Sequence, residues 1–218
     1  MASWMVHIRI ADLLLNKFIN LEETEFVVGN IAPDSGVPSD DWSYYIPSGE
    51  VSHFRDKNKK IQINKYISMY FTKEMQESYN SRQYSFYLGY LVHLMTDILW
   101  KEKIADVCIE NHKEEIAEDK NAFIWKMKAD WYDLDFLYLS KNPQCNAFTI
   151  YKNVDGFKNT YIDGFTEDAF SSRRKHIIDF YNEKRENLDR YYPYLDEEHM
   201  DKFVASSADI LYRQLNKV

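Results

Sequence analysis

One segment of the chain is apolar or aromatic at almost every position: Phe86-Tyr87-Leu88-Gly89-Tyr90-Leu91-Val92-His93-Leu94-Met95-Thr96-Asp97-Ile98-Leu99-Trp100. Within it, His93 and Asp97 are four residues apart, so on a helix both side chains leave the same face. An imidazole and a carboxylate are costly to bury unless they are paired or bind a metal. The segment therefore predicts a buried helix that carries either a metal site or a hydrogen-bonded His–Asp pair.

The composition favours an all-α protein. Among 218 residues there are only 6 Gly and 5 Pro, whereas 17 Tyr, 13 Phe and 5 Trp supply a large aromatic content. A sheet protein of this size would need more turn residues. The length suits one sizeable core, and no repeat or shift in composition divides the chain. We therefore expect one helical domain over residues 1–218.

Charge and targeting signals narrow the function classes. The net charge of −8 argues against binding to duplex nucleic acid, because affinity for phosphates depends on Lys and Arg. The two cysteines are far apart and resemble neither a zinc knuckle nor a disulfide framework. The first residues lack the pattern of a signal peptide, and no uncharged run approaches the roughly 18 residues of a transmembrane segment. We expect a cytoplasmic protein without a transmembrane segment.

Apolar periodicity predicts the remaining helices. The helix that contains the opening segment is expected over about 84–109. The other predicted helices span about 4–20, 61–79, 122–139, 167–191 and 196–217. The run at 26–31 is closed by Gly29, Asn30 and Pro33, which indicates that the helical signal stops there. A packed loop is expected from there to about residue 52, and an irregular segment over 141–163.

Several further polar residues stand out, each with an alternative structural role. His7 borders the apolar stripe of the first helix, where a lone histidine is more often a core residue than a ligand. Asp34 follows Pro33 and could be only a turn former or a helix cap. Asp130 lies in an apolar row and could either be buried with a partner or belong to a solvated rim, whereas for Asp133 the solvated rim is favoured.

Four short motifs then occur in order along the first half of the chain. They are Trp4-x-x-His7, Gly29-Asn30-Ile31-Ala32-Pro33-Asp34, His53-Phe54, and Tyr87-Leu88-Gly89-Tyr90-x-x-His93-x-x-x-Asp97. Together they resemble the zinc-dependent phospholipase C family, whose superfamily also includes single-strand-specific zinc nucleases. The His-x-x-x-Asp motif and the Pro-Asp corner are the most specific parts of the resemblance.

The resemblance implies an all-α bundle with zinc near its centre. Carried over by motif, Asp34, His53, His93 and Asp97 would hold one metal. Asp97 could bridge to a second metal that His7 also binds. Zinc takes imidazole nitrogen and carboxylate oxygen in small coordination shells, so these residue types suit it.

The chain also departs from the family pattern. Relatives supply further histidines and a glutamate soon after the His-x-x-x-Asp motif, but here Trp100, Glu102 and Lys103 follow. Asp130 or Asp135 could replace the missing ligands, and additional carboxylates would make the site more tolerant of manganese or magnesium. Relatives also begin at a tryptophan that binds metal through its main chain, whereas Trp4 follows three residues and could serve only in packing.

We therefore predict a metal-dependent hydrolase of a phosphoester, either a small molecule or a lipid, that uses a metal-activated water. Asp34 is the candidate proton acceptor. The candidate substrate-binding residues are Trp42, Tyr44 and Tyr45, in the loop after Asp34. The alternative is a non-catalytic metal-binding or scaffold protein that keeps the fold with a reduced metal site. A different helical His/Asp phosphohydrolase is less favoured, because the sequence has no contiguous His-Asp pair.

Overall fold

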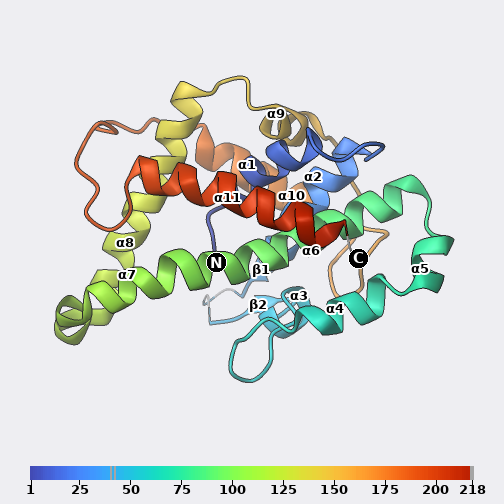
Figure 1. Ribbon diagram of the computed structural model, residues 1–218, viewed down its shortest axis with the longest axis horizontal. Helices are drawn as coiled ribbons and strands as arrows, with labels where there is room; N and C mark the ends of the chain where they lie inside the picture. Colours follow the sequence, from blue (N-terminus) through green and yellow to red (C-terminus); the bar gives the residue numbers. More distant parts are fainter. Residues whose placement is uncertain (40, 42, 217–218) are drawn as a thin grey trace.

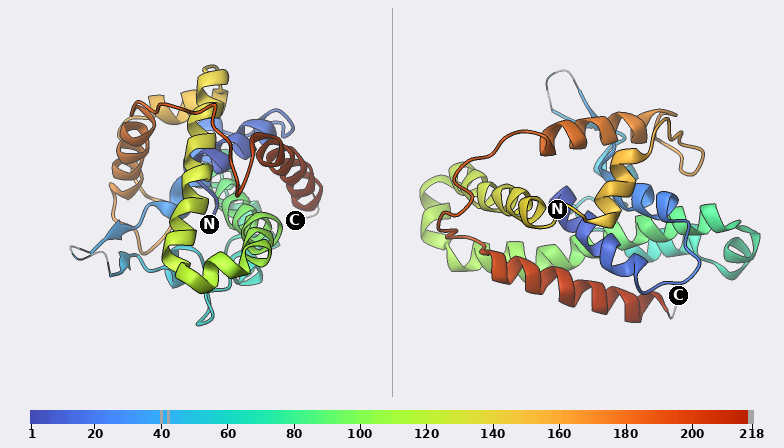
Figure 2. Two further views of the ribbon diagram at one scale, coloured as in Figure 1. Left: turned by 90° about the vertical axis from the view of Figure 1, so that its left-hand side faces the viewer. Right: turned by 90° about the horizontal axis from the view of Figure 1, so that it is seen from above.

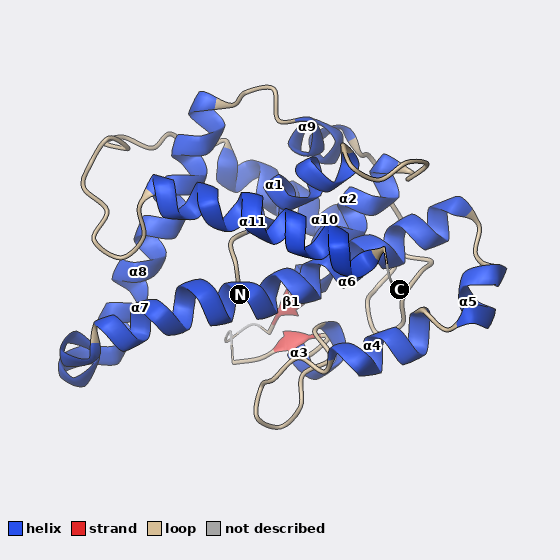
Figure 3. Ribbon diagram, viewed as in Figure 1, coloured by secondary structure: helices blue, strands red, loops and turns tan. Residues whose placement is uncertain are grey.

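The protein is described by a computed structural model that covers residues 1–39, 41 and 43–216. Over these residues the regular secondary structure is helical apart from one short β-ribbon, and loops join the helices (Figures 1 and 3), so the expected all-α fold is confirmed. The elements are α1 (Trp4–Leu15), α2 (Glu23–Ile31), η1 (Ala32–Asp34, 3-10), β1 (Val37–Pro38), β2 (Tyr45–Ile46), α3 (Gly49–Ser52), α4 (Ile63–Tyr70), α5 (Lys73–Ser78), α6 (Ser81–Trp100), η2 (Lys101–Ala105, a π-helix), α7 (Asp106–Asn111), α8 (Lys113–Lys141), α9 (Asn146–Asn153), α10 (Ala169–Tyr181) and α11 (Glu197–Leu215).

Helix α6 is the element around which the others pack. It continues through η2 into α7, and α11 runs alongside it in the long direction of the molecule (Figures 1 and 2). Helices α1, α2 and α4 also contact α6. Apart from the ends of α6, almost all of its residues are buried, including His93 and Asp97. The buried helix predicted from the apolar segment is confirmed.

Two glycines let α2 and α6 cross with their backbones in contact. A Cβ added to Gly29 would lie 2.2 Å from the Phe86 carbonyl oxygen, and one added to Gly89 would lie 2.1 Å from the Phe26 carbonyl oxygen. Gly89 and Gly29 therefore mark close packing of the two helices. The prediction that helical structure stops in the run at 26–31 was wrong: the run forms α2, because its glycine serves helix packing and not a turn.

The N-terminus of α6 is fixed by a capping box. The Asn80 side chain accepts from the Gln83 backbone N–H at 2.9 Å, and the Gln83 side chain accepts from the Asn80 N–H at 3.2 Å. The helix therefore starts at Ser81, earlier than predicted. The single helix expected over 61–79 is two helices, α4 and α5, because Thr72 caps a new start by accepting from the Met75 N–H.

Helices of the second half of the chain pack mainly on α1 and α2, and α11 also contacts α6. Helix α8 begins earlier than predicted, but Asp119 interrupts it with φ −154° and ψ 97°. The Asp119 carboxylate caps the part of α8 that follows, because it accepts hydrogen bonds from the Asn121 and Ala122 N–H groups. The segment expected to be irregular contains α9, and α10 ends at Tyr181 instead of near residue 191. None of the described helices has the length and apolar character to cross a bilayer.

Candidate metal centre

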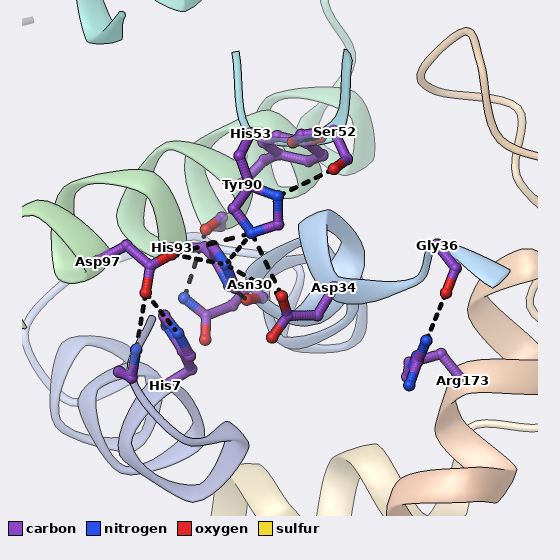
Figure 4. Close-up of polar contacts among 12 residues, drawn as sticks. His7, Asn30, Asp34, Gly36, Ser52, His53, Tyr90, His93, Asp97 and Arg173 are labelled. Atoms are coloured by element: carbon purple, nitrogen blue, oxygen red, sulfur yellow. Dashed lines mark hydrogen bonds and ion pairs between the residues drawn. The ribbon is translucent and has the colours of Figure 1, made fainter. Parts of the chain in front are cut away.

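Five side chains from separate segments meet beside α6 (Figure 4). They come from α1, from the last residue of η1, from the residue after α3, and from two positions on α6. They are His7, Asp34, His53, His93 and Asp97. None of these side chains is more than 8% exposed. The α2–α6 crossing accounts for the arrangement, because it brings the Pro-Asp corner against the His-x-x-x-Asp helix.

Their donor atoms form two groups that share His93. One group is His7, Asp34 and His93, and the other is His53, His93 and Asp97; in each, the donor atoms lie within 4.8 Å of one another. The Nε2 atom of His53 is 3.2 Å from Asp34 Oδ1 and 3.3 Å from His93 Nε2. This spacing is small enough for one ion to contact donors from several segments.

Backbone and hydroxyl groups orient two of the imidazoles. His93 Nδ1 lies 2.7 Å from the Asn30 carbonyl oxygen. Because a carbonyl can only accept, Nδ1 carries the hydrogen and Nε2 of the neutral ring keeps a lone pair directed at the cluster. His53 Nδ1 lies 2.9 Å from Ser52 Oγ, and the Tyr90 hydroxyl donates to the Ser52 carbonyl.

The electrostatics of the cluster favour a neutral His93 and ionised Asp34 and Asp97. Burial, together with neighbouring His7, lowers the pKa of His93 to about 3. Burial opposes ionisation of Asp34, but the hydrogen bond from His53 and the electrostatic effect of the neighbouring imidazoles hold the pKa of that carboxyl well below its usual range. Burial also opposes ionisation of Asp97, but His7 and other neighbouring groups together outweigh burial and lower the pKa of this carboxyl. These are the protonation states that metal binding requires.

Several buried nitrogen and oxygen atoms in or beside the cluster have no hydrogen-bond partner among the described residues. Both ring nitrogens of His7, Asp97 Oδ2 and Asn30 Oδ1 are in this condition. The His7 ring stacks on that of His93 at a centroid distance of 3.8 Å, so the two dipoles are held side by side. Unpaired buried polar atoms are costly, and a cation would satisfy them. The residues present therefore fit a zinc ion.

The two oxygens of Asp97 face different partners. Oδ1 accepts from the Ala2 backbone N–H at 2.8 Å and lies 3.5 Å from His7 Nε2. Oδ2 lies 3.8 Å from His53 Nε2 and 3.9 Å from His93 Nε2. The carboxylate thus lies between His7 on one side and two imidazoles on the other.

Asp130 and Asp135 are not in either donor group of the described residues. Asp130 pairs with Arg190 at 2.7 Å and accepts from the Tyr194 N–H at 2.8 Å. Asp135 accepts from the Ser3 and Tyr181 hydroxyls, each at 2.8 Å. The structure gives both carboxylates structural partners and does not bring them into the cluster.

The three aspartates of α8 differ in their burial and in their surroundings. Asp130 is buried with a partner, as one of the two sequence interpretations proposed. Asp133, interpreted as a rim residue, is partly exposed and also binds Arg190. Burial raises the pKa of Asp135 to about 7, against the opposing effect of its two hydroxyl donors.

The predicted substrate-binding residues lie in the hairpin that follows Asp34. In this hairpin Val37 pairs with Ile46 and Pro38 with Tyr45. Tyr44 and Tyr45 are 56% and 46% exposed, and Trp42 lies outside the described residues. Trp4 is a packing residue, since its ring meets His176, Phe180 and Tyr181 edge to face.

Sequence reasoning missed two residues that support the cluster, Asn30 and Ser52. Asn30 is fully buried, its carbonyl orients His93, and its side-chain amide donates to the Gly89 carbonyl at 3.4 Å. Its position four residues before Asp34, inside an apolar run, was the available signal. Ser52 directly precedes His53, and nothing in its surroundings distinguished it from any other loop serine.

Comparison with protein families agrees with this geometry. The model of the family described as zinc dependent phospholipase C matches residues 6–163, a range that contains all five clustered residues. No match was found among curated proteins or solved structures. The matched range covers well over half of the 218 residues. The chain therefore belongs to the zinc dependent phospholipase C family.

Proposed function

We propose that the protein hydrolyses a phosphoester with one or more zinc ions held by His7, Asp34, His53, His93 and Asp97. The observation that carries the proposal is a set of buried atoms that find no hydrogen-bond partner in the described part of the chain, among them both ring nitrogens of His7 and Asp97 Oδ2. A core that had lost its metal site would be expected to satisfy or replace these groups, since each costs free energy when left unpaired.

The separate orientation of the two Asp97 oxygens supports a bridging role. Asp34, His53, His93 and Asp97 would hold one ion, and Asp97 would also reach a second ion bound by His7, because its carboxylate lies between His7 and the other two imidazoles. Zinc at this site would supply an activated water and neutralise the phosphate oxygens during an in-line displacement. Three imidazoles favour zinc, and the two carboxylates would also accept manganese or magnesium.

The low pKa of Asp34 bears on its proposed catalytic role. A carboxylate that is held ionised by His53 and His93 is a weak base near neutral pH. The same property makes it a good ligand for a cation. We therefore favour Asp34 as a ligand that also positions the attacking water, over Asp34 as the proton acceptor.

The substrate class follows from the family and from the hairpin beside the site. The exposed rings of Tyr44 and Tyr45 would contact the organic part of a small-molecule or lipid phosphoester. A cytoplasmic location, expected from the sequence, would favour soluble phosphoesters over the lipids of an outer membrane surface. That location remains a prediction.

The test is a hydrolysis assay with the zinc-loaded protein on soluble phosphomonoesters, phosphodiesters and phospholipid vesicles. Asp97→Asn should reduce any activity by about 100-fold or more, because it removes a charge that touches both halves of the cluster. Asp133→Asn is the matched control and should retain activity, since Asp133 binds Arg190. Equal activity of Asp97→Asn and the wild type would contradict the proposal.

A second candidate, a metal-binding protein without catalysis, is favoured by one observation. Asp130 and Asp135, the residues predicted to replace missing family ligands, are held by Arg190, Ser3 and Tyr181. A site with fewer ligands could retain one ion in a structural role. Stoichiometric zinc with no hydrolysis of any of the three substrate classes would select this alternative.

A further inference from the structure

Arg173 of α10 lies beside the segment that follows Asp34. One of its terminal nitrogens, Nη2, donates to the Gly36 carbonyl, and its guanidinium carbon is 5.7 Å from the centre of the Trp4 ring. Arg173 also lies outside the residues that the family model matches. The position of its charge is therefore fixed by contacts to two segments that border the metal centre, α1 and the loop after η1.

The charge of Arg173 has no anionic partner in the described part of the chain. Its Nε atom is buried and has no hydrogen-bond partner among those residues, and its guanidinium forms no ion pair with a carboxylate of the described residues. A half-buried guanidinium with an unused donor is an unfavourable arrangement by itself. It becomes favourable when a ligand supplies negative charge and acceptor oxygens.

The location of Arg173 indicates which ligand could supply the negative charge and the acceptor oxygens. Gly36 is two residues from Asp34, and Figure 4 shows the Asp34 carboxylate and the Arg173 guanidinium on the same side of the segment that joins them. The buried Tyr151 is close enough to both Arg173 and Asp34 for their charges to act on its pKa in opposite directions. The guanidinium is thus a cation that borders the metal centre without belonging to it.

We infer that Arg173 binds the anionic phosphoryl group of the substrate, and that the substrate bears a phosphate with free oxygens facing α10. The inference rests on the proposed function, because it assigns part of the substrate of the same site. A planar guanidinium matches phosphate oxygens through paired N–H donors. Its position over the Trp4 ring and its hydrogen bond to the Gly36 carbonyl hold the guanidinium in place before a ligand arrives, which lowers the entropy cost of binding.

Arg174 provides a matched control on the same helix. It also donates to a backbone carbonyl, that of Lys152 on α9, and its Nε also lacks a partner among the described residues. It has neither the Trp4 contact nor the bond to the segment after Asp34. If any half-buried arginine on α10 could bind the phosphate, Arg173→Gln and Arg174→Gln would weaken phosphate binding equally.

The experiment measures binding of inorganic phosphate to the zinc-loaded protein by calorimetry, with zinc content and melting temperature recorded for every variant. Arg173→Gln should weaken phosphate binding by about tenfold or more, because hydrogen bonds between charged groups are the strong ones. Arg173→Lys keeps the positive charge but loses the paired N–H donors of the guanidinium, so its phosphate affinity should lie between those of the wild type and Arg173→Gln. Arg174→Gln should match the wild type, and zinc content should be the same in all four proteins.

A kinetic arm distinguishes the two sources of a phosphate group. With a soluble phosphodiester or with phospholipid vesicles, Arg173→Gln should raise KM more than it lowers kcat on the substrate that the site accepts. The inference is overturned if the zinc-loaded wild type binds no phosphate, or if Arg173→Gln binds it as tightly as the wild type. A different result would contradict the proposed function alone. In that case phosphate binding still depends on Arg173, but the wild type holds no zinc or hydrolyses no phosphoester.

Discussion

The Nδ1 atom of His93 is 2.7 Å from the backbone oxygen of Asn30. This contact links α6 to the last turn of α2, four residues before Asp34, and it exists because Gly29 and Gly89 allow the two helix backbones to touch. Helix packing and ligand orientation therefore depend on the same crossing. Disturbing the crossing should affect both the free energy of unfolding and the metal centre.

Replacing Gly89 by Ala tests the crossing. The new Cβ would lie 2.1 Å from the Phe26 carbonyl oxygen, so α2 and α6 must separate. We expect the free energy of unfolding to fall by about 1–3 kcal/mol or more, measured by urea denaturation, with weaker zinc binding. Gly49→Ala is the control, because its Cβ would approach only the flexible end of Arg55, at 3.3 Å. Equal losses in the two variants would show that the α2–α6 contact is unimportant.

Replacing His93 by Ala tests its role as a ligand. The substitution removes the residue shared by both donor groups and leaves Asp34 and Asp97 as buried charges with fewer partners. We expect loss of bound metal and destabilisation of about 3 kcal/mol, as when one partner of a buried ion pair is removed. Asp133→Ala should leave the metal content unchanged. Full metal content in His93→Ala would remove His93 from the ligand set.

Asp135 should make stability depend on pH. Its pKa is raised from 3.8 to about 7 in the folded protein. The unfolded chain therefore releases this proton first, so the stabilisation is complete below pH 3.8 and is lost as the pH rises through 7. Asp135→Asn removes this dependence while keeping a polar group for Ser3 and Tyr181. The melting temperature of the variant relative to the wild type should rise between pH 4 and pH 8, and a constant difference would contradict the raised pKa.

Chelation provides a test that changes no residue. If His7 and Asp97 are left unpaired without metal, dialysis against a chelator should lower the melting temperature, and added zinc should restore it. The His93→Ala variant should show neither effect. A wild-type melting temperature that is the same with and without chelator would argue for a hydrogen-bonded core pair.

The central helix and much of the cluster could be predicted from the sequence, because apolar periodicity and the His-x-x-x-Asp spacing are local signals. Helix α2 could not, since Gly29 and Asn30 are typical of a break when read locally, and only the partner helix shows that the glycine serves packing. Asp130 and Asp135 were considered as ligands because the chain lacks the histidines and glutamate that relatives supply after the His-x-x-x-Asp motif. Their hydroxyl, backbone and arginine partners come from segments up to 132 residues away.

The orientation of the imidazoles was also beyond the sequence. Neither the carbonyl of Asn30 nor the hydroxyl of Ser52 carries a sequence signal that assigns it to a histidine. In the sequence, Arg173 lies in a short basic stretch, and such a stretch is typical of a solvated face. Only the fold places it against Trp4 and Gly36.

The most direct test of the metal centre is metal content per chain. Protein purified without an affinity metal or chelator would be measured by elemental mass spectrometry, beside Asp97→Asn and the control Asp133→Asn. We predict at least one equivalent of zinc in the wild type and the control, and loss of most of it in Asp97→Asn. A well-folded wild-type protein without bound metal, even after incubation with zinc, would contradict the account and leave His93 and Asp97 as a polar pair in the core.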